Sequence, residues 1–255
     1  MSTEDTIARI VELLRQAQRV LFVTGAGISA DSGLPTYRGV AGLYEGKETE
    51  EGLPIEAALS GEVFALRPDI TWKYLAQIER NCRGARPNAA HRAIAELETR
   101  LTLVQVFTQN VDGLHRKAGS RNLIEVHGSL DSLHCPRCRY RTPVESLEGR
   151  DLPPQCPRCG SVLRPDIVLF GESLPEGAID RLLATLADGV DMVFAIGTTA
   201  VFPYVAHPVI AAARARIPTV EINPAPTRLS EHVGFRLRLG AAEAMTTIMA
   251  RLEST

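Results

Sequence analysis

The sequence predicts an α/β protein with a parallel sheet and a smaller second lobe. Short apolar runs typical of buried strands alternate with helix-like patterns along most of the 255 residues. Two long stretches, 39–86 and 133–163, interrupt this alternation. At roughly 100 to 200 residues per domain, the length fits one large domain that carries a smaller module.

The elements of the large domain follow in order. Residues 6–18 carry apolar side chains at the i, i+3, i+4, i+7 spacing of one helix face, and 20–23 form a short apolar run of the kind found in strands buried on both faces. The same two patterns recur further along the chain. They predict strands at 103–107, 123–126, 190–196 and 219–222, and helices at 90–98, 179–186 and 205–213.

The two interruptions differ in composition. Residues 39–86 contain an acidic loop and a helix at 70–82 but no convincing buried strand, which predicts a helical insertion. Residues 133–163 are rich in Cys, Pro and Arg and poor in aliphatic residues, so we expect a module that does not depend on a hydrophobic core. The sheet domain would then comprise 1–38, 87–132 and 164–255.

Composition excludes several classes of protein. The 28 Lys and Arg residues against 30 Asp and Glu give a net charge of −2, so no overall basic field is present to hold nucleic acid. Hydrophobic residues make up 45% of the chain but aromatics only 5%, which predicts an aliphatic core. The N-terminus lacks the pattern of a secretory signal, and no run approaches the ~20 apolar residues of a membrane span. We therefore expect a cytoplasmic protein with no membrane partner.

Four of the five cysteines form two Cys-Pro-Arg-Cys pairs. Two such pairs at this separation are typical of a zinc site in which sulfur fills all four positions, so the metal would be structural. A redox dithiol is the alternative. Arginines around the pairs also leave nucleic-acid binding open, although Tyr140 is the one aromatic available for base stacking. The predicted metal ligands are Cys135, Cys138, Cys156 and Cys159.

A glycine-rich loop directly follows the first predicted strand. Its pattern is Gly25-x-Gly27-x-x-Ala30, which brings backbone N–H groups close to a pyrophosphate because glycine adds no side chain. Glycines also end strands for conformational reasons alone. An acidic residue expected ~20 positions later at the end of a second strand is missing. The loop thus predicts a dinucleotide whose pose differs from that in a dehydrogenase.

Several motifs in order make the chain closely resemble the sirtuin family of NAD-dependent protein lysine deacylases. The motifs span nearly the whole chain. They are the glycine-rich stretch 25–39, Thr-Gln-Asn-Val-Asp at 108–112, His-Gly at 127–128, both Cys-Pro-Arg-Cys pairs, the stretch 164–172, Gly-Thr-Thr at 197–199 and Ile-Asn-Pro at 222–224. The resemblance implies a Rossmann-like parallel sheet domain with a smaller lobe formed by a four-cysteine zinc module and a helical insertion. NAD and the acyl-lysine would meet between the lobes.

The resemblance also implies which residues bind NAD. The phosphates would lie on Gly25, Ala26 and Gly27, and the nicotinamide and its ribose in a pocket that includes Asp112. Other contacts would come from the loop after the glycines and from the ends of later strands. The full set is Gly25, Ala26, Gly27, Asp31, Pro35, Thr36, Tyr37, Arg38, Gln109, Asn110, Val111, Asp112, Gly197, Thr198, Thr199, Asn223, Pro224 and Ala241.

His127, Asn110 and Asp112 would be the catalytic residues. In the family mechanism the acyl-lysine carbonyl oxygen displaces nicotinamide at the ribose anomeric carbon. His127 then acts as general base and helps the ribose 2′-hydroxyl attack the imidate carbon, a role that suits a side chain with a pKa near 6.5. Hydrolysis gives free lysine and 2′-O-acyl-ADP-ribose, so NAD is consumed without hydride transfer.

The substrate would bind as an added strand, and a neighbouring helix would select the acyl group. The peptide would pair along Val168, Phe170, Gly171 and Glu172, which reads backbone and leaves side-chain specificity loose. Family members that remove acidic acyl groups carry Tyr-x-x-Arg on the selecting helix. Here Tyr74 is followed by Gln77, and the register one residue along, 75–78, supplies no arginine either. We therefore expect deacetylation, with longer neutral acyl chains tolerated.

Two other functions remain open from the sequence. The first is protein mono-ADP-ribosyltransfer, which shares the NAD-cleaving step but needs a protein nucleophile. The second is a non-catalytic module that senses NAD or ADP-ribose. The combination of Asn110, Asp112 and His127 favours an active enzyme over the second.

Overall fold

The computed structural model describes residues 2–36 and 48–254. Six parallel strands form the main sheet in the order β3-β2-β1-β7-β8-β9. This is the doubly wound order in which the chain moves outward from β1 in both directions, so a crevice lies at the carboxyl ends of the central strands. The strands are β1 (Arg19–Thr24), β2 (Leu103–Thr108), β3 (Leu123–Glu125), β7 (Met192–Ile196), β8 (Thr219–Ile222) and β9 (Phe235–Leu237).

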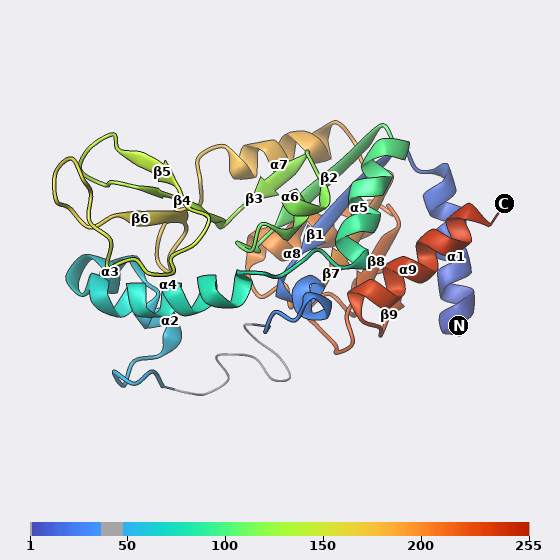
Figure 1. Cartoon of the computed structure of the whole chain (residues 1–255). Helices are drawn as coiled ribbons and strands as arrows, with labels where there is room; N and C mark the ends of the chain where they lie inside the picture. Colours follow the sequence, from blue (N-terminus) through green and yellow to red (C-terminus); the bar gives the residue numbers. More distant parts are fainter. Residues whose placement is uncertain (1, 37–47, 255) are drawn as a thin grey trace.

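Helices cover both faces of this sheet, as Figure 1 shows. Val20 and Phe22 of β1 pack into the core beneath α1 (Thr3–Gln16), α5 (Ala89–Arg100) and α9 (Ala241–Glu253). The alternate residues Leu21 and Val23 pack into a second core with α7 (Ala178–Ala187) and α8 (Pro203–Arg214). Burial on both faces explains why the strands are apolar runs without alternation. The expected parallel α/β sheet is confirmed.

Side-chain caps define where two of these helices begin. The Ser2 hydroxyl accepts a hydrogen bond from the Asp5 N–H at 3.1 Å, and the Asp5 carboxylate bonds back to Ser2, so α1 starts with a capping box. The Asn88 side chain caps α5 by accepting from the Ala90 N–H at 2.9 Å. Asn88 also donates to the carbonyl of Ile28 at 2.7 Å, which ties α5 to the segment after β1.

A second lobe is inserted into the crossovers of the sheet. Its first part lies between β1 and α5, and its second part is an antiparallel sheet in the order β5-β4-β6. Figure 1 shows this lobe at the left, with α4 extending from it toward the large sheet. Its elements are α2 (Ile55–Ala58), α3 (Gly61–Leu66), α4 (Pro68–Cys82), β4 (Gly128–His134), β5 (Arg141–Pro143) and β6 (Arg164–Ile167). Strand β4 crosses the expected start of the module at 133, and β6 begins directly after its expected end at 163.

The second lobe has a hydrophobic core, contrary to the expectation for 133–163. Leu133, Leu163 and the first cysteine of each pair pack with the helices of the insertion around Trp72, which is 1% exposed. The Trp72 indole donates to the carbonyl of Leu163 at 2.9 Å. The few aliphatic residues of the cysteine-rich segment suffice because α2 and α4 supply the other half of the core.

The remaining elements connect the lobes to the site. A 3₁₀-helix, η1 (Ala26–Ser32), follows β1, and the short α6 (Leu114–Ala118) follows β2.

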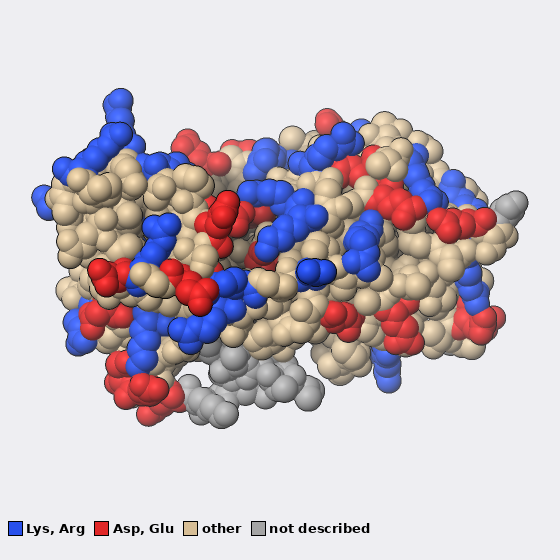
Figure 2. Space-filling view, in the orientation of Figure 1, with Lys and Arg blue, Asp and Glu red and all other residues tan. Residues whose placement is uncertain are grey.

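Over the described residues, no helix is both long enough and apolar enough to cross a bilayer. On the face drawn in Figure 2, acidic and basic side chains are interspersed across both lobes.

Candidate active site between the lobes

The carboxyl ends of four neighbouring strands bring the predicted cofactor residues together. Segments 25–29, 109–112, 197–199 and 223–224 follow β1, β2, β7 and β8 directly. Parallel strands end at the same edge of a sheet, so these four segments meet where the strand order reverses. Gln109 and Asn110 stand at the end of β2, where a dehydrogenase would carry the ribose-binding acid.

Glycines allow two of these segments to touch. A Cβ on Gly27 would lie 2.6 Å from the Cα of Gly197, and one on Gly25 would lie 2.9 Å from the Gly197 carbonyl oxygen. Gly197 itself has a φ of +61°. The N–H of Gly27 donates to the Gly197 carbonyl at 2.8 Å, and that of Gly25 donates to Ile196 at 3.1 Å. The glycines therefore permit backbone packing within the protein, and this fixes the shape of the loop on which we expect the phosphates to lie.

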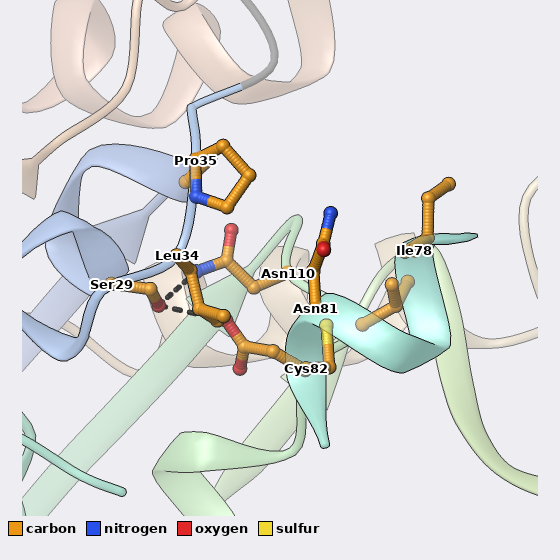
Figure 3. Close-up of a pocket in the computed structure, with 10 residues that line it drawn as sticks. Ser29, Leu34, Pro35, Ile78, Asn81, Cys82 and Asn110 are labelled. Atoms are coloured by element: carbon orange, nitrogen blue, oxygen red, sulfur yellow. Dashed lines mark hydrogen bonds between the residues drawn. The ribbon is translucent and has the colours of Figure 1, made fainter. Parts of the chain in front are cut away.

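Ser29, Asn110 and Asp112 form a hydrogen-bonded cluster beside this loop (Figure 3). The buried Ser29 hydroxyl donates to the Asp112 carboxylate at 2.7 Å and lies 3.2 Å from the Asn110 amide nitrogen, which donates to it. Asn110 also donates to the Gly25 carbonyl, and Asp112 accepts from the Leu114 N–H at 2.9 Å. Burial raises the pKa of the Asp112 carboxyl, against the lowering effect of its hydrogen-bond donors.

The cluster forms one wall of a pocket between the two lobes. The labelled residues in Figure 3 come from the segment after β1, from the end of β2 and from α4. Leu34, Ile78 and Cys82 give the pocket an apolar side, and burial raises the pKa of the Cys82 thiol to about 12. The lining residues are Ala26, Ser29, Leu34, Pro35, Ile78, Asn81, Cys82, Asn110, Val111 and Asp112.

His127 lies on the link between the two lobes. It follows β3 and precedes β4 directly. Its Nδ1 lies 3.0 Å from the Gln109 carbonyl oxygen and its Nε2 lies 2.8 Å from the Tyr204 hydroxyl. A carbonyl only accepts, so Nδ1 carries the hydrogen and Nε2 has the lone pair. Burial lowers the pKa of the imidazole, which keeps it neutral and basic at neutral pH.

The NAD contacts predicted at the ends of β7 and β8 lie further along the same edge. Gln109 donates to the Thr198 hydroxyl at 2.9 Å, and Asn223 donates to the Thr198 carbonyl at 3.3 Å. Thr199 and Pro224 are exposed beside them. These contacts connect the ends of β2, β7 and β8 into one surface.

The residues predicted to bind NAD from the loop after the glycines differ in their surroundings. The Asp31 carboxylate accepts from the Ala242 N–H at 2.9 Å and so caps the N-terminus of α9, next to the buried Ala241. Pro35 lines the pocket, and Thr36 is half-buried beside it in sequence. Tyr37 and Arg38 lie outside the described residues.

The expected peptide-binding segment is held in place by Glu172. Arg164 forms two hydrogen bonds of 2.7 Å with the Glu172 carboxylate, which also accepts from the Leu169 N–H. Within the segment, the N–H and carbonyl of Phe170 bond to Leu59 and Gly61. The Val168 N–H donates to the His127 carbonyl at 2.9 Å, while the Phe170 side chain is 39% exposed. The segment therefore starts next to the histidine and presents an apolar ring.

The two predicted acyl-selecting residues do not line the pocket. The Tyr74 hydroxyl hydrogen-bonds to Glu51 at 2.5 Å, and Gln77 is exposed. Ile78, which ends the alternative register 75–78, lines the pocket in their place (Figure 3).

The four predicted metal ligands converge in the second lobe. Their sulfur atoms all lie within 4.8 Å of one another, with Cys135 and Cys159 3.4 Å apart and Cys138 and Cys156 3.6 Å apart. Four thiolates on a tetrahedral Zn²⁺ with bonds of about 2.3 Å have sulfur–sulfur edges of about 3.8 Å. The donor set therefore fits one zinc ion with no position left for water, which makes the metal structural.

Sequence reasoning missed three contributors to the site. Ser29 lies within the glycine-rich motif, and its hydroxyl two residues after Gly27 was the available signal. Phe202 and Tyr204 surround His127, but no periodic pattern brings 202–204 to residue 127. That contact depends on the parallel pairing of β1 with both β2 and β7.

Comparison with known proteins gives consistent results. Residues 25–203 match the model of the Sir2 family. The chain is 49% identical over 256 residues to a protein of Pseudomonas aeruginosa named NAD-dependent protein deacylase 2, covering 99% of each. A solved Sir2 homolog–NAD complex superposes with a TM-score of 0.85 at 36% identity, covering 96% of this chain and 93% of that one. A solved complex of Sir2 with a p53 peptide and NAD⁺ gives 0.82 at 28% identity, covering 96% and 98%.

Proposed function

This chain belongs to the Sir2 family, and on that premise we propose that it removes acyl groups from protein lysines at the expense of NAD. One observation of the site carries the proposal. A neutral histidine with its lone pair on Nε2 is hydrogen-bonded to Gln109, the residue before Asn110, whose amide lines a pocket together with the Asp112 carboxylate. Such a site can bind the carboxamide of nicotinamide and supply a general base. This chemistry consumes NAD and requires no hydride transfer.

Each polar group has a task in this reaction. Asp112 and Asn110 would hold nicotinamide and its ribose, while the carbonyl oxygen of acyl-lysine attacks the anomeric carbon. The carbon–nitrogen bond then breaks and nicotinamide leaves with the electron pair. His127 would take the proton of the ribose 2′-hydroxyl as that oxygen attacks the imidate carbon. Water completes the reaction to free lysine and acyl-ADP-ribose.

The peptide would lie along the segment at 168–172. Phe170 offers an exposed apolar ring there, and Glu172 keeps the segment rigid through Arg164. The hydrogen bond from Val168 to His127 fixes the spacing between peptide and base. We therefore propose an extended acyl-lysine peptide as the substrate.

The acyl group would be neutral. Ile78 and Cys82 give the α4 side of the pocket an apolar surface, and Ile78 stands where an arginine would be needed to pair with an acyl carboxylate. The Tyr74 hydroxyl is occupied by Glu51. Acetyl and longer neutral chains suit such a wall, whereas burying a succinyl carboxylate without a partner is costly.

Mass spectrometry of matched peptides tests both proposals. Wild type and His127→Ala are incubated with NAD and either an acetyl-lysine or a succinyl-lysine peptide, and free peptide and O-acyl-ADP-ribose are quantified. We expect faster removal of acetyl by wild type and no product from the variant. Faster removal of succinyl would contradict the apolar pocket. NAD cleavage independent of acyl-lysine would favour ADP-ribosyltransfer, and no NAD-dependent product would favour a sensing module.

A further inference from the structure

Two aromatic rings lie against His127, and one of them, Tyr204, contacts Nε2. Phe202 and Tyr204 stack with their centroids 5.4 Å apart and an interplanar angle of 10°. Each ring meets the imidazole edge-on, at 6.1 Å and at 87° and 85°. Tyr204 belongs to the first turn of α8, directly after Pro203 at the start of the helix. The rings therefore reach the histidine from the start of a helix of the large sheet domain.

The two hydrogen bonds of His127 determine which ring nitrogen carries the hydrogen and which group donates in each bond. Because the Gln109 carbonyl accepts from Nδ1, Nε2 of the neutral ring carries no hydrogen and can only accept. The Tyr204 hydroxyl, 2.8 Å away, must then be the donor. Burial raises the pKa of this phenol and lowers that of the imidazole, so both groups are neutral at physiological pH. The lone pair that a general base needs is thus occupied.

We propose that Tyr204 is a positioning residue that caps the basic nitrogen of His127 in the free enzyme and yields it to a hydroxyl of the ribose. This proposal rests on the proposed function, in which His127 is the base. Nε2 has one lone pair, so it cannot accept a proton while the phenol donates to it. Substrate binding then exchanges one O–H···N hydrogen bond for another, and the imidazole keeps its tautomer and orientation throughout.

Removal of the phenol oxygen alone tests this exchange. Tyr204→Phe keeps the ring that stacks on Phe202 but leaves Nε2 without a donor. Tyr140→Phe is the matched control, because it removes a phenol oxygen from the zinc module of the same chain. Thermal unfolding of both variants establishes that each is folded.

The first readout is the ¹⁵N NMR signal of His127 in full-length protein with labelled histidine. In the free protein, we expect the ¹⁵N chemical shift of Nε2 in Tyr204→Phe to move toward the value of a nitrogen that accepts no hydrogen bond. Wild type and Tyr140→Phe should have the same chemical shift as each other. Saturation with ADP-ribose should bring all three proteins to the same signal. Identical signals in the free proteins, or signals that stay different with ADP-ribose, would overturn the proposal.

The second readout separates KM from kcat. Without the competing phenol, we expect the KM for NAD to fall about threefold, the scale of one neutral hydrogen bond, with kcat within about twofold of wild type. An unchanged or higher KM with a lower kcat would refute the exchange. The NMR readout requires only that the protein binds ADP-ribose. If the wild type fails to deacylate peptides, the proposed function is wrong, but the NMR readout still tests the role of Tyr204.

Discussion

Ser29 connects the polar groups of the pocket through a single hydroxyl. It donates to Asp112 and accepts from Asn110, and it is 1% exposed. Ser29→Ala leaves the carboxylate and the amide each short of a partner in a buried site. We expect a loss of about 1–3 kcal/mol in the free energy of unfolding and about a tenfold lower kcat/KM. Denaturant titration and deacylation assays measure these, with the exposed Ser254→Ala as a control that leaves both unchanged.

The pKa of His127 determines the acid side of the pH profile. Burial lowers this pKa below the ordinary 6.5, and the neutral form is the base. Activity should therefore be flat through neutral pH and fall on acidification with a midpoint below 6.5. The pH dependence of kcat/KM for an acetyl-lysine peptide measures the midpoint, and His207→Ala, an exposed histidine on α8, should leave it in place. A midpoint above 6.5 would contradict the proposed burial effect.

At the scale of elements, the contact between the β1 and β7 loops depends on Gly197. A Cβ there would lie 2.2 Å from the Ile28 nitrogen and 2.3 Å from the Gly27 carbonyl carbon, at a φ that disfavours side chains. Gly197→Ala should reduce the free energy of unfolding by about 2–4 kcal/mol and weaken NAD binding, because the glycine loop must shift.

Gly234→Ala is the matched control for that change. Its Cβ would meet the Thr219 carbonyl at an ordinary 3.6 Å. Urea unfolding should find it within about 0.5 kcal/mol of wild type. Equal stabilities of the two variants would show that the glycine loop yields more easily than its contacts indicate.

The elements found from the sequence are those whose signal is local. The central strands are apolar runs, and α4 shows an amphipathic pattern, so their positions follow from residue order. Strand β9 has only three residues, too few for a pattern. Helix α9 was detectable, since Ala241, Ala244, Met245 and Ile248 follow helical spacing, but alanines make that stripe weakly apolar.

The candidate site, like the elements, was predictable only where the sequence itself carries the signal. Motif residues such as Asn110 and His127 could be identified because the sequence motifs that contain them resemble those of the sirtuin family. The partner of His127 could not, because Tyr204 belongs to α8, which packs on β7 and β8, and reaches the histidine only through the folded sheet. Likewise, the register of α4 was ambiguous from spacing, and only the orientation of the helix brings Ile78 to the pocket while Tyr74 turns to Glu51.

At the scale of the molecule, the zinc site stabilises a core that both parts of the second lobe share. Cys135 and Cys156 are buried in the cluster that contains Trp72. Chelation should therefore loosen α4 as well as the cysteine knuckles, lowering the thermal midpoint by about 10 °C and abolishing activity.

Metal analysis and calorimetry test this with two variants. Wild type and Cys82→Ser should each contain one zinc per chain, because Cys82 is outside the four-sulfur cluster. Cys138→Ser should lose the metal and show the chelated midpoint. Full thermal stability without zinc would mean that the shared hydrophobic core suffices.

The connection from β3 to β4 consists of Val126 and His127 and joins the lobes. Gly128 has a φ of +78°, and a Cβ on it would lie 1.9 Å from the Asp166 carbonyl oxygen, so the chain turns sharply against β6 immediately after the histidine. The imidazole thus lies at the point where the chain passes from the sheet domain into the zinc lobe. A change in the orientation of the zinc lobe relative to the sheet domain would therefore displace the imidazole, and a cross-link that holds the zinc lobe in one orientation should lower the rate of deacylation.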